Sequence, residues 1–224
     1  MPKTNASLNF KIAMTGVFAA LSVVLALTPV GYIVIPGTFI SITIMHVPAI
    51  LAALTAGLGP GISVGFVFGL TSLIRAAVNG GGSNPFFLNP LVSVLPRMIF
   101  PLAAWAIFKI FNSIPKMPKA VSAAFASAAG TFVNTALVML AIYLFYGQTL
   151  ISGMAETFEK FGFNILDLSG FKGYYAIMAC TLLTNGFFEI IAAMIICIAV
   201  VTSIYAIKNK KSKITRLEEE SEKE

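Results

Sequence analysis

Six long apolar segments constrain the fold of this 224-residue chain more than any other feature of its sequence. Each is long enough to cross the hydrocarbon core of a bilayer as an α-helix, which takes about 20 residues. Within that core every backbone N–H and C=O group needs a partner, and a helix supplies those partners from its own segment. We therefore predict six transmembrane helices, at residues 10–30, 39–58, 62–78, 91–111, 120–146 and 174–207.

The composition supports this membrane assignment and excludes a soluble domain. Hydrophobic residues make up 58% of the chain and charged residues only 11%, whereas a soluble domain carries about 25% charged residues. The first segment is long for the apolar core of a signal peptide, and no small-residue cleavage site follows it cleanly. We expect an all-α integral membrane protein, with a single membrane domain at residues 1–207 and a charged cytoplasmic tail at 208–224.

The lysines and arginines predict which side of the membrane each connection faces. If the N-terminus is cytoplasmic, eleven of the 15 basic residues lie on the cytoplasmic side. The remaining four lie on the outer side, namely Arg75, Arg97, Lys160 and Lys172. Because cytoplasmic loops are enriched in positive charge, we expect both termini in the cytoplasm. The net charge of +6 is then a topology signal and does not indicate nucleic-acid binding.

An amide-rich outer loop between residues 75 and 98 is the most unusual connection in the chain. Arg75 and Arg97 flank the glycines at 80–82 and three asparagines, Asn79, Asn84 and Asn89. Arginine presents a planar fork that matches a carboxylate or phosphate, and asparagine both donates and accepts hydrogen bonds. This set suits a pocket for an anionic solute. The alternative, in which the arginines anchor to lipid headgroups beside an ordinary surface turn, remains open.

Four polar residues lie inside the predicted spans, where polar groups are costly and by default mark functional sites; they are His46, Asn134, Asn185 and Glu189. Asn185 precedes Glu189 by one helical turn, so these two and Asn134 form one candidate cavity for a solute. For Glu189, a protonated hydrogen-bonding role between helices is an equal alternative. His46 is explained equally well if it satisfies a backbone carbonyl freed by Pro48.

Catalytic and metal chemistry find little support in the sequence. The chain has one histidine, one aspartate (Asp167) and no P-loop motif, so neither a histidine-based metal site nor a Ser-His-Asp set can be assembled. Cys180 and Cys197 lie in apolar runs without metal-ligand spacing. We therefore expect no enzyme activity and no cofactor, and any energy for transport comes from another protein.

Small residues on the first segment predict a docking face. They are Ala13, Gly16 and Ala20, and the last two lie four residues apart on one helical face. Such a face lets another membrane helix approach closely, although small residues also serve packing within one chain. Docking of another protein is the favoured interpretation, because this small chain has no ATP-hydrolysis motif of its own to drive transport.

The stretch ITIMHVPAILAALTAGLGPGISVGFVFGLTSLIR, residues 42–75, is similar to a pattern in the substrate-binding S components of energy-coupling factor (ECF) vitamin transporters. The resemblance covers nearly the whole chain, including the long outer connection before the last span. It implies a six-helix bundle in a prokaryotic cell membrane that binds a vitamin near its outer face. It also implies docking on a transmembrane T subunit, which sits on two ATPase subunits. Gly16 and Ala20 match the docking feature, whereas Val17 stands where a small residue is expected.

The branch with this pattern is often assigned to pantothenate, so the resemblance implies pantothenate as the substrate. Either Arg75 or Arg97 would hold its carboxylate, and the hydroxyls and amide would fall to Asn79, Asn84, Asn134 or Asn185. A pyridoxine-like or thiamine-precursor-like vitamin is the alternative substrate. Two other classes stay open: a membrane enzyme that uses His46 and Glu189, and an assembly subunit that binds no solute.

Overall fold

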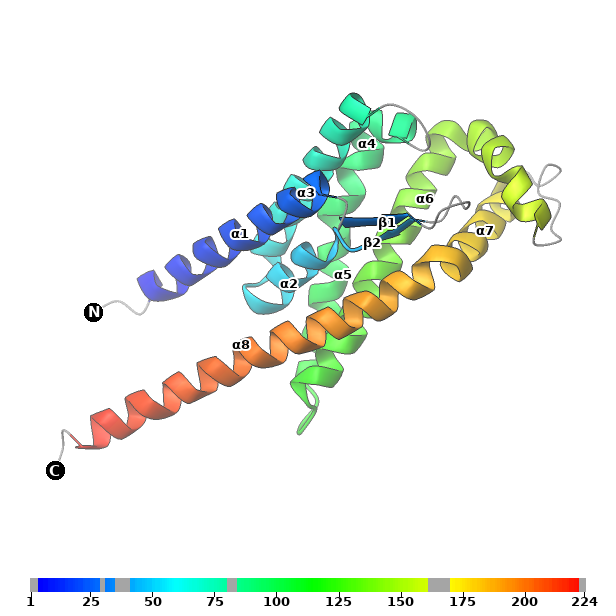
Figure 1. Ribbon diagram of the computed structural model, residues 1–224. Helices are drawn as coiled ribbons and strands as arrows, with labels where there is room; N and C mark the ends of the chain where they lie inside the picture. The colour runs from blue at the N-terminus through cyan, green and yellow to red at the C-terminus, as the bar shows by residue number, and fades with distance from the viewer. Residues whose placement is uncertain (1–3, 29–30, 35–40, 80–83, 161–169, 222–224) are drawn as a thin grey trace.

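The computed structural model describes residues 4–28, 31–34, 41–79, 84–160 and 170–221 (Figure 1). Most of these residues are helical. In chain order the elements are α1 (Thr4–Leu27), β1 (Tyr32–Val34), β2 (Ser41–Thr43), α2 (Val47–Thr55), α3 (Leu58–Asn79), the 3₁₀ turn η2 (Asn84–Leu88), α4 (Pro90–Ser93), α5 (Leu95–Asn112), α6 (Lys119–Lys160), α7 (Gly170–Thr181), the π turn η3 (Leu182–Gly186) and α8 (Phe187–Ser221).

Five helical stretches in the described part of the chain are long and apolar enough to cross a membrane. Each overlaps one of the predicted segments, and only the segment at 39–58 has no counterpart among them. The five stretches are Leu8–Leu27, Leu58–Val78, Pro90–Asn112, Lys119–Gly147 and Phe187–Lys210. The helical membrane fold is thereby confirmed, whereas six spanning helices are not. The last predicted segment consists of three successive elements, because α7 is followed by the π turn η3 and then by α8. Helix α8 continues beyond the segment through the basic tail to Ser221.

The prediction of one spanning helix at residues 39–58 was wrong. Residues 41–43 form β2, which pairs antiparallel with β1, and the helix that follows, α2, has only nine residues. β-Branched residues such as Ile42 and Thr43 favour a strand. Pro48 lies in the first turn of α2, where its missing N–H is tolerated. Gly57 has φ of +109°, a conformation that suits glycine, and α2 has ended before it.

Two ends of the bundle can be distinguished in Figure 1. Both termini lie at one end, and η2, α4 and the α6–α7 corner lie at the other. Helix α6 kinks at Tyr146, where the backbone leaves helical geometry (φ −137°, ψ 22°), and continues to Lys160. The connection after the fifth span therefore begins as a helix, and residues 161–169 lie outside the described part.

A glycine face on α3 allows the closest helix packing in the bundle. Helix α3 packs against α1, α2 and α5, and α5 in turn packs along α6. A Cβ atom built on Gly61 would lie 2.6 Å from the Ala53 Cβ, and one on Gly69 would lie 2.7 Å from the Val94 Cα. One on Gly65 would overlap the Arg97 carbonyl oxygen. Gly61 thus lets α3 approach α2, and Gly65 and Gly69 let it approach the start of α5 at backbone contact distance.

Candidate functional site

The two ionisable groups predicted inside the spans, His46 and Glu189, are both buried, but each has a partner that the sequence did not indicate. His46 is 1% exposed at the start of α2, and its Nε2 lies 3.0 Å from the Thr131 hydroxyl of α6. Its ring meets Phe100 of α5 edge-on, with 6.5 Å between centroids. Among the described residues, Nδ1 has no hydrogen-bond partner. His46 therefore links α2 to the α5–α6 core and keeps one ring nitrogen available.

Glu189 connects α8 to the short sheet. Its Oε1 accepts hydrogen bonds from the Thr43 backbone N–H at 2.7 Å and from the Thr43 hydroxyl at 2.8 Å. Glu189 is 7% exposed, so these bonds replace the water that burial removes. The structure thus gives Glu189 a structural task, with β2 rather than another helix as its partner.

This tie gives a testable expectation for stability. Glu189→Ala leaves the partly buried Thr43 N–H without its acceptor and should cost about 1–3 kcal/mol. Glu189→Gln keeps an oxygen at the same place and should lose less than half as much. Thermal unfolding of the detergent-purified protein measures both variants. Equal losses in the two would mean that the negative charge, and not the accepted hydrogen bonds, carries the effect.

Two asparagine side chains offer unused hydrogen-bonding capacity inside the bundle. Asn134 on α6 is 8% exposed, and Asn185 lies in η3, partly buried. The Oδ1 atom of each is buried and has no partner among the described residues. Buried polar atoms normally have partners, and π turns occur often at functional sites. The π turn η3 contacts α6, β2 and α8. It therefore adjoins the helix that carries Asn134 and the two elements that the Thr43–Glu189 hydrogen bonds connect.

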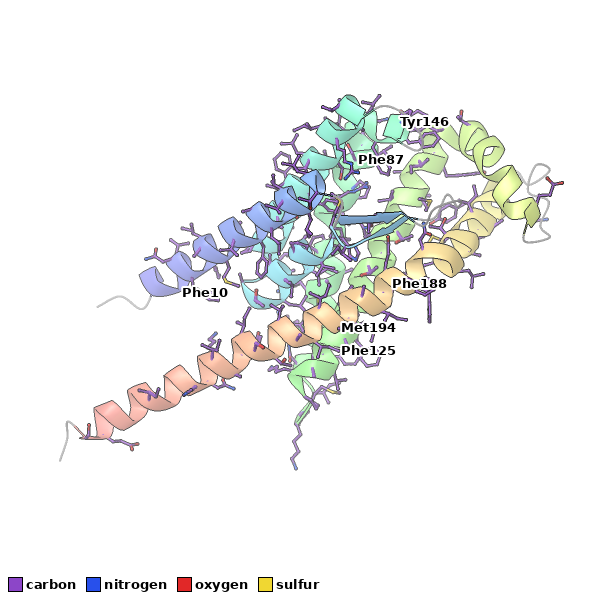
Figure 2. The ribbon with its side chains drawn as sticks, in the orientation of Figure 1. Phe10, Phe87, Phe125, Tyr146, Phe188 and Met194 are labelled. Atoms are coloured by element: carbon purple, nitrogen blue, oxygen red, sulfur yellow. The ribbon has the colours of Figure 1, made fainter. Side chains whose placement is uncertain are left out.

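Arg97 points into the protein. It is 5% exposed, and its Nη1 donates to the Val92 carbonyl oxygen. The guanidinium carbon lies 4.9 Å from the centroid of the Phe87 ring and 5.5 Å from that of Phe68, within cation–π range. Figure 2 shows Phe87 at the same end of the molecule as Tyr146. Anchoring to lipid headgroups is therefore excluded for Arg97, which presents a buried cation near that end.

The other polar residues of the amide-rich loop are either less buried than Arg97 or have side chains outside the described part. Arg75 is partly buried and donates to the Ala26 carbonyl oxygen at 3.0 Å, which ties α3 to α1. The Asn89 side chain caps α4 by accepting from the Leu91 N–H at 3.0 Å. Asn79 ends α3 and Asn84 begins η2, but their side chains lie outside the described part, as do residues 80–83. Arg97 is more buried than Arg75 and Asn89, the other two side chains of this set that the structure describes.

The predicted docking residues lie on an open face of α1. Ala13, Gly16 and Ala20 are exposed, and a Cβ atom on Gly16 would meet nothing within 4 Å. The opposite face is buried through Phe18, Ser22 and Ala26. Within the described part of the chain, these small residues are therefore open to a partner.

A groove of about 220 Å³ between α4, α5 and α6 does not coincide with the polar groups. It is lined by apolar side chains, among them Leu91, Ile99 and Leu144. It has no group that recognises a polar ligand, so the candidate site is the set of buried polar residues and not this groove. Sequence reasoning missed Thr43, Thr131 and Phe68, because only their partners in space distinguish them from ordinary residues of an apolar segment.

Comparison with known proteins decides the family. The sequence profile of the substrate-specific component of ECF transporters matches residues 10–201. The chain belongs to this family. The S component is also 25% identical to the pantothenic acid transporter PanT of Lactococcus lactis subsp. cremoris (strain MG1363), over 93% of its own length and 99% of the relative.

Membership of the family confirms the resemblance found in the sequence. Together with the apolar helices, it makes this S component a multi-pass protein of the prokaryotic cell membrane and a component of vitamin transport. Both the family and the relative are transport components, in agreement with the expectation that the chain is not an enzyme.

Proposed function

We propose that this S component captures pantothenate at the outer face of the cell membrane. The observation that carries the proposal is the buried Arg97 guanidinium in a bundle that also holds two buried amide oxygens, on Asn134 and Asn185, for which the described residues supply no hydrogen-bond partner. Pantothenate has a carboxylate for the first, and hydroxyls and an amide N–H for the others. The relative named as a pantothenic acid transporter supports the same substrate.

Within this proposal the residues have different tasks. Arg97 pairs with the carboxylate, because buried ion pairs with a planar guanidinium are strong and directional. Asn134 and Asn185 take the hydroxyls and amide, and His46 offers Nδ1 to the same ligand. Glu189 positions β2 through Thr43. Arg75, Asn79, Asn84 and Asn89 contribute to the mouth of the site.

The proposal includes the orientation of the chain. Helices α1 and α3 both run away from the end that carries the termini (Figure 1), so the chain returns between Leu27 and Leu58. That return, which includes the short sheet and α2, is the sixth crossing. Both termini and the tail at 208–224 are then cytoplasmic, as the distribution of lysine and arginine favours.

The proposal also includes the partners that drive import. A transmembrane T subunit docks on the small-residue face of α1 at Ala13, Gly16 and Ala20, and two ATPase subunits supply the energy. The support is that this face is exposed and unused in the chain itself.

Uptake of labelled pantothenate tests binding and docking separately. Cells that make this chain with a T subunit and two ATPase subunits should accumulate the vitamin. Gly16→Leu should abolish uptake but leave pantothenate binding by the purified chain unchanged, because a Cβ atom at that position would meet no other described part of the chain within 4 Å. Ala19→Leu, on the neighbouring and partly buried face, is the matched control for helix crowding. Normal uptake by Gly16→Leu would contradict docking at this face.

A further inference from the structure

Five exposed lysines gather where three membrane spans end. The spans of α5, α6 and α8 end or begin at Asn112, Lys119 and Lys210. We call the surface that these lysines form the basic end. It consists of Lys109, Lys116, Lys119, Lys208 and Lys210.

Aromatic contacts show that these span ends adjoin. The Lys119 Nζ lies 5.3 Å from the centroid of the Tyr205 ring, which joins the start of α6 to α8. The rings of Phe111 and Phe125 stack at 4.8 Å, which joins α5 to α6, and Figure 2 shows Phe125 away from the end that carries Phe87. Lys208 follows Tyr205 by three residues and so shares its helical face.

The charge of the basic end is not neutralised by the described part of the protein. No carboxylate there pairs with any of the five lysines; the Lys119 Nζ donates to the neutral Asn112 side chain at 2.7 Å. The Lys109 Nζ lies 5.0 Å from the centroid of the Trp105 ring. Tryptophan and tyrosine are typical of the membrane–water interface, so the ammonium groups lie at the level of lipid headgroups.

Apolar side chains stand beside the charges. Ile110, Ile114 and Ile207 are 59%, 44% and 69% exposed. A ligand that covers this surface must combine anionic oxygens with hydrocarbon. Basic clusters next to the end of a membrane span attract anionic lipids, and a soluble phosphate would leave the isoleucines in water. We propose that the basic end is a binding site for the headgroups of anionic phospholipids in the leaflet that it faces.

The fluorescence of Trp105 tests this proposal, because the chain has a single tryptophan and the Lys109 ammonium lies against its ring. The full chain is placed in phosphatidylcholine vesicles that contain either brominated phosphatidylglycerol or brominated phosphatidylcholine, at equal mole fractions. Bromine quenches tryptophan at short range. The anionic lipid should quench several-fold more effectively. The difference in quenching between the two lipids should become smaller between about 0.1 M and 1 M salt, because the screening length falls from about 10 Å to 3 Å.

Substitutions locate the site. Lys109→Gln combined with Lys119→Gln should reduce the preference for the anionic lipid by about two- to fivefold for each lysine removed. Lys172→Gln, an exposed lysine near the start of α7, is the matched control and should change nothing. Comparing two lipids within one variant cancels any change in the intrinsic emission of Trp105. Equal quenching by the two lipids in the unchanged protein, or an equal loss of preference in the control, would overturn the proposal.

Discussion

Gly65→Ala is expected to destabilise the protein by at least about 3 kcal/mol, at the upper end of the range for overpacked sites. The new Cβ would overlap the carbonyl oxygen of Arg97, which is backbone and cannot rotate away. Helix α3 must therefore move away from α5, and the close approach of Gly69 to Val94 at the start of α5 is lost with it. At roughly 2–4 °C per kcal/mol for a chain of this size, the unfolding midpoint should fall by about 6–12 °C.

Gly59→Ala is the matched control for this effect. Gly59 lies in the first turn of the same helix, and a Cβ atom there would meet nothing within 4 Å. It should unfold at the temperature of the unchanged protein or slightly above, since alanine favours helix more than glycine does. If both variants lost stability equally, the cause would be glycine flexibility, and the close packing of α3 on α5 would not be the explanation.

Arg97→Ala is expected to weaken pantothenate binding by at least about 30-fold, because truncating one partner of a buried, hydrogen-bonded charge pair costs about 2–5 kcal/mol. Arg97→Lys keeps the charge but loses the planar fork, so it should restore only part of the affinity. Equilibrium binding of labelled pantothenate to each purified variant measures the effect.

Arg75→Ala separates ligand binding from general damage. Arg75 is less buried than Arg97, and its Nη1 donates to a backbone carbonyl of α1. It should therefore change the affinity for pantothenate much less. Each variant is first checked for an unchanged unfolding midpoint without ligand. A larger loss of affinity in Arg75→Ala than in Arg97→Ala would assign the carboxylate to the other arginine and contradict the role proposed for Arg97.

Hydropathy was sufficient to predict the long helices, because a bilayer leaves few other structures for an apolar segment. It was not sufficient at residues 39–58, where the segment is equally apolar but β-branched residues, Pro48 and Gly57 divide it into a strand and a short helix. The glycines of α3 were not singled out in the sequence, because their role depends on the backbone of α5 that Gly65 and Gly69 approach.

The candidate site was predictable in its residue types and not in its pairings. Asn134 and Glu189 were chosen because polar groups are costly in a span, and the structure buries both. The tie from Glu189 to Thr43 crosses 146 residues of sequence, and no local pattern reports a contact at that distance. Asn89 illustrates the converse, since an asparagine before Pro90 is also what a helix cap requires, and capping is the role the structure shows. Ligand contacts for these residues stay predictions.

Calorimetric titration of the detergent-purified chain with pantothenate and with panthenol tests the central claim most directly. Panthenol has an alcohol in place of the carboxylate and otherwise the same hydroxyls and amide. The account predicts saturable binding of pantothenate at one site per chain, with panthenol bound at least about 30-fold more weakly because it offers Arg97 no charge. No binding of pantothenate by a folded sample, or equal affinity for the two compounds, would contradict it.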